Sequence, residues 1–196
     1  MKLKSILAAA VLAAAGTGSA FADAIPYPGG GENATTYSFT AAADGNINAY
    51  FLGSGASYDE YLGMLVNGTP TGITGLQNHS TAIGTVLDLG AVHAGDVLTF
   101  FIFVQTTGAT WYSTQGLNAD GSNHVYSTSF SGSGTVPAGT YIGFEDLPAT
   151  GSDFNYADEQ FSFTNVATSV VPEPGGVALL LAGLGLVGAM ARRRRG

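Results

Sequence analysis

Basic side chains occur only at the two ends of this chain. Lys2 and Lys4 lie near the start and Arg192 to Arg195 near the end, with no Lys or Arg between them. All but one of the 14 Asp and Glu residues fall within residues 23–168, the exception being Glu173. A carboxylate in that central part must therefore be hydrated, hydrogen-bonded to neutral donors or bound to a cation. This restriction applies to any fold that the central part adopts.

The N-terminus has the features of a secretory signal peptide. The short basic stretch "MKLK" precedes the apolar stretch "SILAAAVLAAAG", and "AFAD" follows with small residues at Ala20 and Ala22. This pattern predicts a signal helix over residues 1–22 that signal peptidase removes between Ala22 and Asp23. A buried helix would not explain the Lys pair and the abrupt change to polar sequence.

The C-terminus predicts a membrane-spanning helix. Residues 175–191 are uncharged and mostly apolar, and a helix of that length spans about 25 Å, at the short end for a bilayer. The four residues that follow would stop transfer and fix the cytoplasmic side; they are Arg192, Arg193, Arg194 and Arg195.

Immediately before that helix lies the tetrapeptide "VPEP", formed by Val171, Pro172, Glu173 and Pro174. Two prolines keep the segment extended, a form that the groove of a processing enzyme can bind. Residues 169–196, with this motif, an apolar helix and an Arg cluster at 192–195, resemble the PEP-CTERM sorting signal of Gram-negative bacteria. The resemblance implies processing by an exosortase, a membrane enzyme with a Cys nucleophile. It also implies a precursor anchored in the inner membrane, delivery to the cell surface or extracellular space, and an organism that secretes exopolysaccharide.

The passenger domain, residues 23–168, is predicted to be all-β. Short runs rich in β-branched and aromatic residues, such as "TYSFT", "NAYFL", "YLGMLV", "TVLDLG", "HVYSTSF" and "EQFSFTNV", are predicted strands. Clusters of Gly, Asn, Asp and Ser separate them, and the chain contains 29 Gly. The expected fold is an antiparallel β-sandwich of jelly-roll or immunoglobulin-like type. The run "VLTFFIFV" suits a central strand buried on both faces, and "NVATSVV" is expected to be a linker. The chain has no Cys, so neither disulfides nor thiol catalysis is available.

The acidity of the passenger domain limits its partners. Without Lys or Arg it is not expected to bind nucleic acid. Its carboxylates serve either solubility, through mutual repulsion, or the binding of cations.

Two stretches are rich in oxygen ligands of the kind that Ca²⁺ prefers. The first, "GFEDLPATGSDFNYADEQ", is not an EF-hand but supplies the candidates Glu145, Asp146, Asp153, Asn155 and Asp158, followed by Glu159. The second, "LNADGSNHVY", supplies Asn118, Asp120 and Asn123. The tetrapeptide "ADGS" in it is equally typical of a tight turn in which Asp bonds its own backbone.

These stretches also resemble a bacterial surface domain of unknown function found in proteins with PEP-CTERM signals. The shared features are "GDVLTFFIFV", the loop Asn118 to His124, and "GFEDLP" with acidic residues as far as Asp158. The resemblance implies a β-sandwich surface module without an established activity. This chain departs from the pattern at Glu159 and Gln160, which stand where an aliphatic residue would start the last strand.

No catalytic motif stands out in the chain. It lacks the G-x-S-x-G and H-E-x-x-H patterns, so a secreted hydrolase is the weakest alternative. Trp111 and Tyr112 either form a platform for stacking sugars or pack in the core. We expect an exported, non-catalytic protein with a structural or adhesive role in a biofilm matrix that contains exopolysaccharide. A Ca²⁺-dependent carbohydrate-binding module is the alternative.

Overall fold

The computed structural model describes residues 25–171 together with residues 181, 182, 184 and 190. The signal peptide, its cleavage site, the segment from Pro172 to Pro174 and the C-terminal arginines lie outside the described residues. The four isolated described positions, in the segment predicted to span the membrane, have helical backbone. Among the described residues, no helix has both the length and the apolar character to cross a bilayer.

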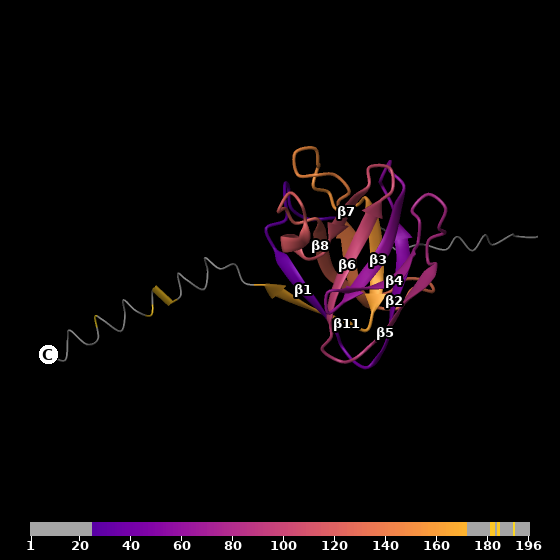
Figure 1. Cartoon of the computed structure of the whole chain (residues 1–196), viewed down its shortest axis with the longest axis horizontal. Helices are drawn as coiled ribbons and strands as arrows, with labels where there is room; N and C mark the ends of the chain where they lie inside the picture. The colour runs from indigo at the N-terminus through magenta and orange to yellow at the C-terminus, as the bar shows by residue number, and fades with distance from the viewer. Residues whose placement is uncertain (1–24, 172–180, 183, 185–189, 191–196) are drawn as a thin grey trace, which may run out of the picture.

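Residues 25–171 form two antiparallel β-sheets (Figure 1). One sheet has the order β11–β1–β6–β3–β4, with β7 also paired to β6. Its strands are β1 (Thr36–Ala41), β3 (Glu60–Val66), β4 (Thr69–Gly75), β6 (Val97–Val104), β7 (Ala109–Tyr112) and β11 (Val166–Val171). The other sheet has the order β5–β2–β10–β9–β8. Its strands are β2 (Gly45–Gly53), β5 (Val86–Val92), β8 (Val125–Phe130), β9 (Gly139–Phe144) and β10 (Glu159–Thr164). A single 3₁₀ turn, η1 (Gln115–Leu117), follows β7.

The core lies between the two sheets, as the predicted sandwich requires. Phe100 of β6 and Phe163 of β10 are fully buried, and their ring centroids are 4.1 Å apart. Phe161 of β10 packs with Phe51 of β2 and Phe144 of β9 in the same core. Large aromatic side chains thus supply much of the apolar surface that stabilises a domain without disulfides.

Side chains along β6 alternate between the core and the outer face of the sheet. Leu98, Phe100 and Ile102 are buried, whereas Phe103 is 38% exposed and Phe101 is half-buried. The strand is central, since it pairs with β1 on one edge and β3 on the other. The prediction that both of its faces are buried was wrong, because no second layer covers the outer face over the described residues.

Several strands were not predicted from the sequence. β4, β7 and β9 are short or rich in Gly and Thr, so their apolar periodicity is weak. The expected linker after residue 165 is instead β11, which pairs along its whole length with β1, from Thr36 opposite Val171 to Ala41 opposite Val166. The sandwich therefore extends to Val171, beyond the expected boundary at residue 168.

Candidate functional site

Two glutamates point into the space between the sheets. Glu60 begins β3 on the same strand face as the buried residues Leu62 and Met64, and Glu159 begins β10 on the same face as Phe161. Each side chain is 0% exposed. Glu60 was not predicted as a site residue, although its inward position in the alternating run "EYLGM" was a signal that could have identified it.

The loop between β9 and β10 brings three more carboxyl groups to the same end of the sandwich. This loop is the orange one at the top of Figure 1. One carboxylate oxygen from each of Glu145, Asp146 and Asp158 lies within 4.8 Å of the others. The charges of Asp146 and Asp158 act on both Glu60 and Glu159. We call these five side chains the carboxylate cluster: Glu60, Glu145, Asp146, Asp158 and Glu159.

Backbone amides hold part of the cluster in place. The Asp146 N–H donates to Asp158 Oδ2 at 2.9 Å, and the Tyr156 N–H donates to Glu145 Oε2 at 3.4 Å. Tyr156 has φ of 53°, a left-handed conformation that costs about 1 kcal/mol for a residue other than Gly. Its side chain is buried, and its hydroxyl accepts a hydrogen bond from the Asn33 N–H at 2.6 Å. The packed ring therefore holds its amide toward Glu145.

The surroundings of the cluster oppose ionisation. Burial, contact with the Asp146 carboxyl group and the charge of Glu159 raise the pKa of Glu60 to about 11. Burial and the charges of Glu145 and Asp146 raise the pKa of Asp158 to about 8, although the Asp146 amide opposes the shift. Burial also raises the pKa of Glu145 and Glu159 above the usual range. Chemically, the cluster can hold protons or a hard cation.

Two of the predicted ligands from the same loop lie outside the compact group. Asp153 and Asn155 are exposed. The Asn155 backbone N–H and side-chain amide donate to Asp153 at 3.1 and 2.8 Å. Asp153 is near enough for its charge to raise the pKa of Glu145, but its carboxylate serves a local turn.

The residues of the 118–124 loop have a different arrangement. Asn118 accepts the Tyr112 N–H and donates to the carbonyls of Tyr112 and Ser122. Asn123 donates to the carbonyls of Asn33, Thr35 and Val125, and it accepts the Val125 N–H. Asp120 accepts the N–H groups of Ser122 and Ala149 at 3.0 and 2.9 Å. These bonds tie the loop to its neighbours, as the turn interpretation expects.

His124 and Trp111 connect this loop to the base of the carboxylate cluster. His124 Nδ1 lies 3.0 Å from the Glu145 carbonyl oxygen and Nε2 lies 3.1 Å from Asp120 Oδ2. Both ring nitrogens thus face acceptors, and the tautomer decides which of them donates. The Trp111 ring stacks on His124 with centroids 3.9 Å apart, and its Nε1–H donates to the Asp146 carbonyl at 2.6 Å. Trp111 is only 5% exposed, so of the two interpretations the residue follows the one in which it packs in the core.

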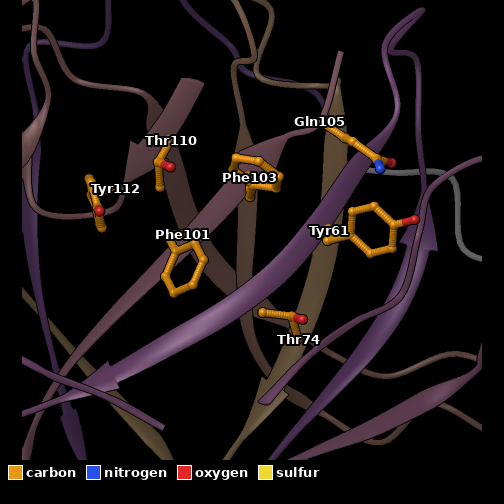
Figure 2. A pocket seen from close by; sticks show the side chains of 7 residues that line it. All are labelled: Tyr61, Thr74, Phe101, Phe103, Gln105, Thr110 and Tyr112. Carbon is orange, nitrogen blue, oxygen red and sulfur yellow. The ribbon is translucent and has the colours of Figure 1, made fainter. Parts of the chain in front are cut away.

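Tyr112, by contrast, lines a pocket on the outer face of the β11–β1–β6–β3–β4 sheet (Figure 2). The pocket has a volume of about 370 Å³. Aromatic rings and uncharged hydrogen-bonding groups line it, from Tyr61, Thr74, Phe101, Phe103, Gln105, Thr110 and Tyr112. The Phe101 and Tyr112 ring centroids are 5.8 Å apart.

A glycine makes room for one of these rings. Gly63 of β3 is the cross-strand partner of Phe101 on β6. A Cβ atom at Gly63 would collide with the Phe101 ring, so the ring lies across the neighbouring strand. This close contact between ring and backbone forms part of the pocket wall.

Comparison with known proteins identifies only the C-terminal segment. Residues 170–195 match the family model of the PEP-CTERM protein-sorting motif, which confirms the predicted sorting signal. No curated protein and no solved structure matches the chain. The match indicates an exported protein that an exosortase processes, made as a membrane-anchored precursor and then delivered to the surface. The chain is thus a β-sandwich protein that carries a PEP-CTERM sorting motif at its C-terminus.

Proposed function

We propose that this protein is a non-catalytic component of an extracellular matrix, where it adheres to polysaccharide through the pocket on the outer sheet face. The side chains that line the pocket are the observation that supports this function. Sugar rings present C–H faces that stack on aromatic side chains and hydroxyl groups that bond to Thr, Gln and Tyr. Tyr61, Phe103 and Tyr112 supply the rings, and Gln105 and Thr110 supply polar groups beside them.

The uncharged lining of the pocket and the acidic chain around it limit the class of polysaccharide that can bind. No charged side chain lines the pocket, and the described chain from residue 25 to 171 contains no Lys or Arg that would attract an anion. An acidic polymer would be repelled by the surrounding carboxylates. The expected ligand is therefore a neutral glycan chain.

The arrangement of the carboxyl groups supports a binding role over a hydrolytic one. A glycosidase needs two carboxyl groups that face a bound sugar from opposite sides. Here Glu60 and Glu159 are fully buried between the sheets, while the aromatic pocket contains no carboxyl group. The alternative of a Ca²⁺-dependent carbohydrate-binding module differs in requiring the ion for sugar binding.

Binding of the full chain to an array of neutral and acidic glycans tests the proposal. Phe103→Ala should reduce binding to neutral glycans at least tenfold, because it removes a ring that lines the pocket. Val97→Ala is the matched control, since Val97 is a 53% exposed residue of the same strand that does not line the pocket. Failure to bind any neutral glycan, equal losses in both variants, or release of cleaved sugar would overturn the proposal.

A further inference from the structure

The carboxylate cluster contains buried acid groups without a compensating partner. The oxygens Oε1 and Oε2 of Glu60 and of Glu159 are all buried and take no hydrogen bond within the described part of the chain. Glu60 lies beside the Asp146 carboxyl group, and two carboxyl groups can bond to each other only if one carries a proton. A buried carboxylate with neither a hydrogen-bond donor nor a cation beside it strongly destabilises the folded chain.

Nearby donors do not supply the missing positive charge. The chain has no Lys or Arg between Lys4 and Arg192. His124, in the loop that contacts Glu145, bonds to the Glu145 backbone carbonyl and to Asp120. The other histidines contact Asp59 and Asp44, which are not members of the cluster.

We propose that the carboxylate cluster binds a divalent cation, with Ca²⁺ preferred. Calcium takes about six to eight oxygen ligands at roughly 2.3–2.6 Å, so two ligands of one ion lie at most about 5 Å apart. The three oxygens of Glu145, Asp146 and Asp158 fall within 4.8 Å of one another. Glu60 and Glu159 lie outside this group of three, but the charges of Asp146 and Asp158 act on both. In the proposed site they would complete the ligand set from two strands, one in each sheet.

The ion would join three parts of the fold. Glu60 belongs to β3 of one sheet, Glu159 to β10 of the other, and Asp146 to the loop that closes this end of the sandwich. A cation in this position replaces mutual repulsion with attraction to a common centre. It binds the folded chain selectively, because the unfolded chain does not hold the five carboxyl groups together. The proposal goes beyond polysaccharide adhesion and does not depend on it.

Luminescence of Tb³⁺, a Ca²⁺ substitute, provides a sensitive test. The chain has a single Trp, and its indole nitrogen lies 2.6 Å from the Asp146 carbonyl oxygen. Excitation of Trp111 should therefore sensitise Tb³⁺ bound to the cluster in the full chain, purified in non-ionic detergent after treatment with a chelator. Added Ca²⁺ should displace the Tb³⁺ signal, and Mg²⁺ should do so only at concentrations at least tenfold higher.

Substitutions separate this site from general attraction of cations by an acidic protein. Glu159→Gln and Glu60→Gln should each weaken Tb³⁺ and Ca²⁺ binding at least tenfold, because each removes a ligand charge at nearly constant volume. Asp153→Asn is the matched control and should change affinity less than threefold, since Asp153 is exposed and outside the compact group. Calcium should also raise the melting temperature of the parent by more than 5 °C at constant ionic strength, and of Glu159→Gln by less than 2 °C.

Three outcomes would overturn the proposal. These are absence of a Tb³⁺ signal together with no heat of Ca²⁺ binding, an equal thermal shift in the parent and Glu159→Gln, and equal loss of affinity in Asp153→Asn. Near-ultraviolet circular dichroism of each variant in chelator shows whether the core is intact. A variant that has lost this signal is replaced by Asp146→Asn, for which the same loss of affinity is expected. Loss of glycan binding in Phe103→Ala with retained Ca²⁺ binding would separate this site from the adhesive role.

Discussion

The 118–124 loop and the carboxylate cluster lie close together, and both are rich in side-chain oxygens, yet their chemistry differs. Asp120 accepts two backbone amides and contacts the His124 ring. Glu60 and Glu159 bury their carboxyl groups without any comparable donor in the described chain. Burial has a different effect in the two places because only the first provides partners for a negative charge.

The pKa values express the same difference. Partial burial of Asp120 opposes ionisation, but the amides of Ala149 and Ser122 and the His124 ring outweigh it and lower the pKa. Burial and like charges instead raise the pKa of Glu60 to about 11. A polar stretch whose oxygens accept hydrogen bonds stabilises a loop, whereas buried oxygens without donors indicate a place where a cation or protons can bind.

The largest expected effect concerns stability in the presence of a chelator. The folded-state pKa values of Glu60 and Asp158, about 11 and 8, exceed the ordinary values of 4.5 and 3.8. The folded chain therefore keeps protons that the unfolded chain has lost, and stability falls as pH rises from about 5 through 8. The fall is about 1.4 kcal/mol per pH unit for each retained proton, or about 4 kcal/mol over three units for each of the two groups. Urea denaturation at several pH values measures it.

Two comparisons sharpen this test. Glu60→Gln should reduce the slope by the share of one retained proton, because Gln does not titrate in either state. Asp153→Asn should change the slope less, because the Asp153 carboxylate acts on the cluster only through its charge on Glu145. Saturating Ca²⁺ should remove the fall in the parent by binding the ionised cluster. An identical slope in parent and Glu60→Gln would show that Glu60 does not titrate as its surroundings require, and the contrast with the loop would be lost.

A smaller effect is expected from Asn123→Ala in the 118–124 loop. Asn123 is 2% exposed and donates to three backbone carbonyls, so its truncation leaves buried acceptors without donors. The expected loss is about 3 kcal/mol in the free energy of unfolding, equal in chelator and in Ca²⁺. Asn46→Ala is the control, because Asn46 bonds to Asp88 at an exposed site and should cost less than about 0.5 kcal/mol. A loss that depends on Ca²⁺ would instead place Asn123 at the ion site.

The sequence predicted the class of fold because the information was local. Runs rich in β-branched and aromatic residues identified strands such as β1, β8 and β10, and the turn residues between these runs favoured a sandwich. The outward phase of β6 was not predicted, because "VLTFFIFV" is apolar at nearly every position. Only the structure shows that Phe101 and Phe103 face outward from the sheet.

The carboxylate cluster was predicted only in part, for a topological reason. Glu145, Asp146 and Asp158 are close in sequence and were recognised as possible ligands together. Glu60 lies in the other sheet and far away along the chain. It could be assigned to the cluster only once the pairing of β3 with β6 and of β10 with β9 was known. Sequence spacing also grouped Asp153 with the cluster, although its side chain bonds to Asn155 and is exposed.

The smallest expected effect, from Asp120→Asn, gives the most direct contrast because its pH dependence has the opposite sign. The folded-state pKa of Asp120 is lowered, so its stabilising contribution is present above the ordinary value of 3.8 and is lost as pH falls through the folded-state value. Asp120→Asn should cost about 1 kcal/mol at pH 7 and progressively less as pH falls below 3.8, as measured by urea denaturation in chelator. Glu60→Gln should instead raise the free energy of unfolding at high pH.

If both substitutions had their effect in the same pH range, the two regions would be coupled, because His124 contacts both Asp120 and the backbone of Glu145. If the signs are opposite, the hydrogen bonds of the loop and the unpaired charges of the cluster act independently, although they are only a few residues apart in the fold.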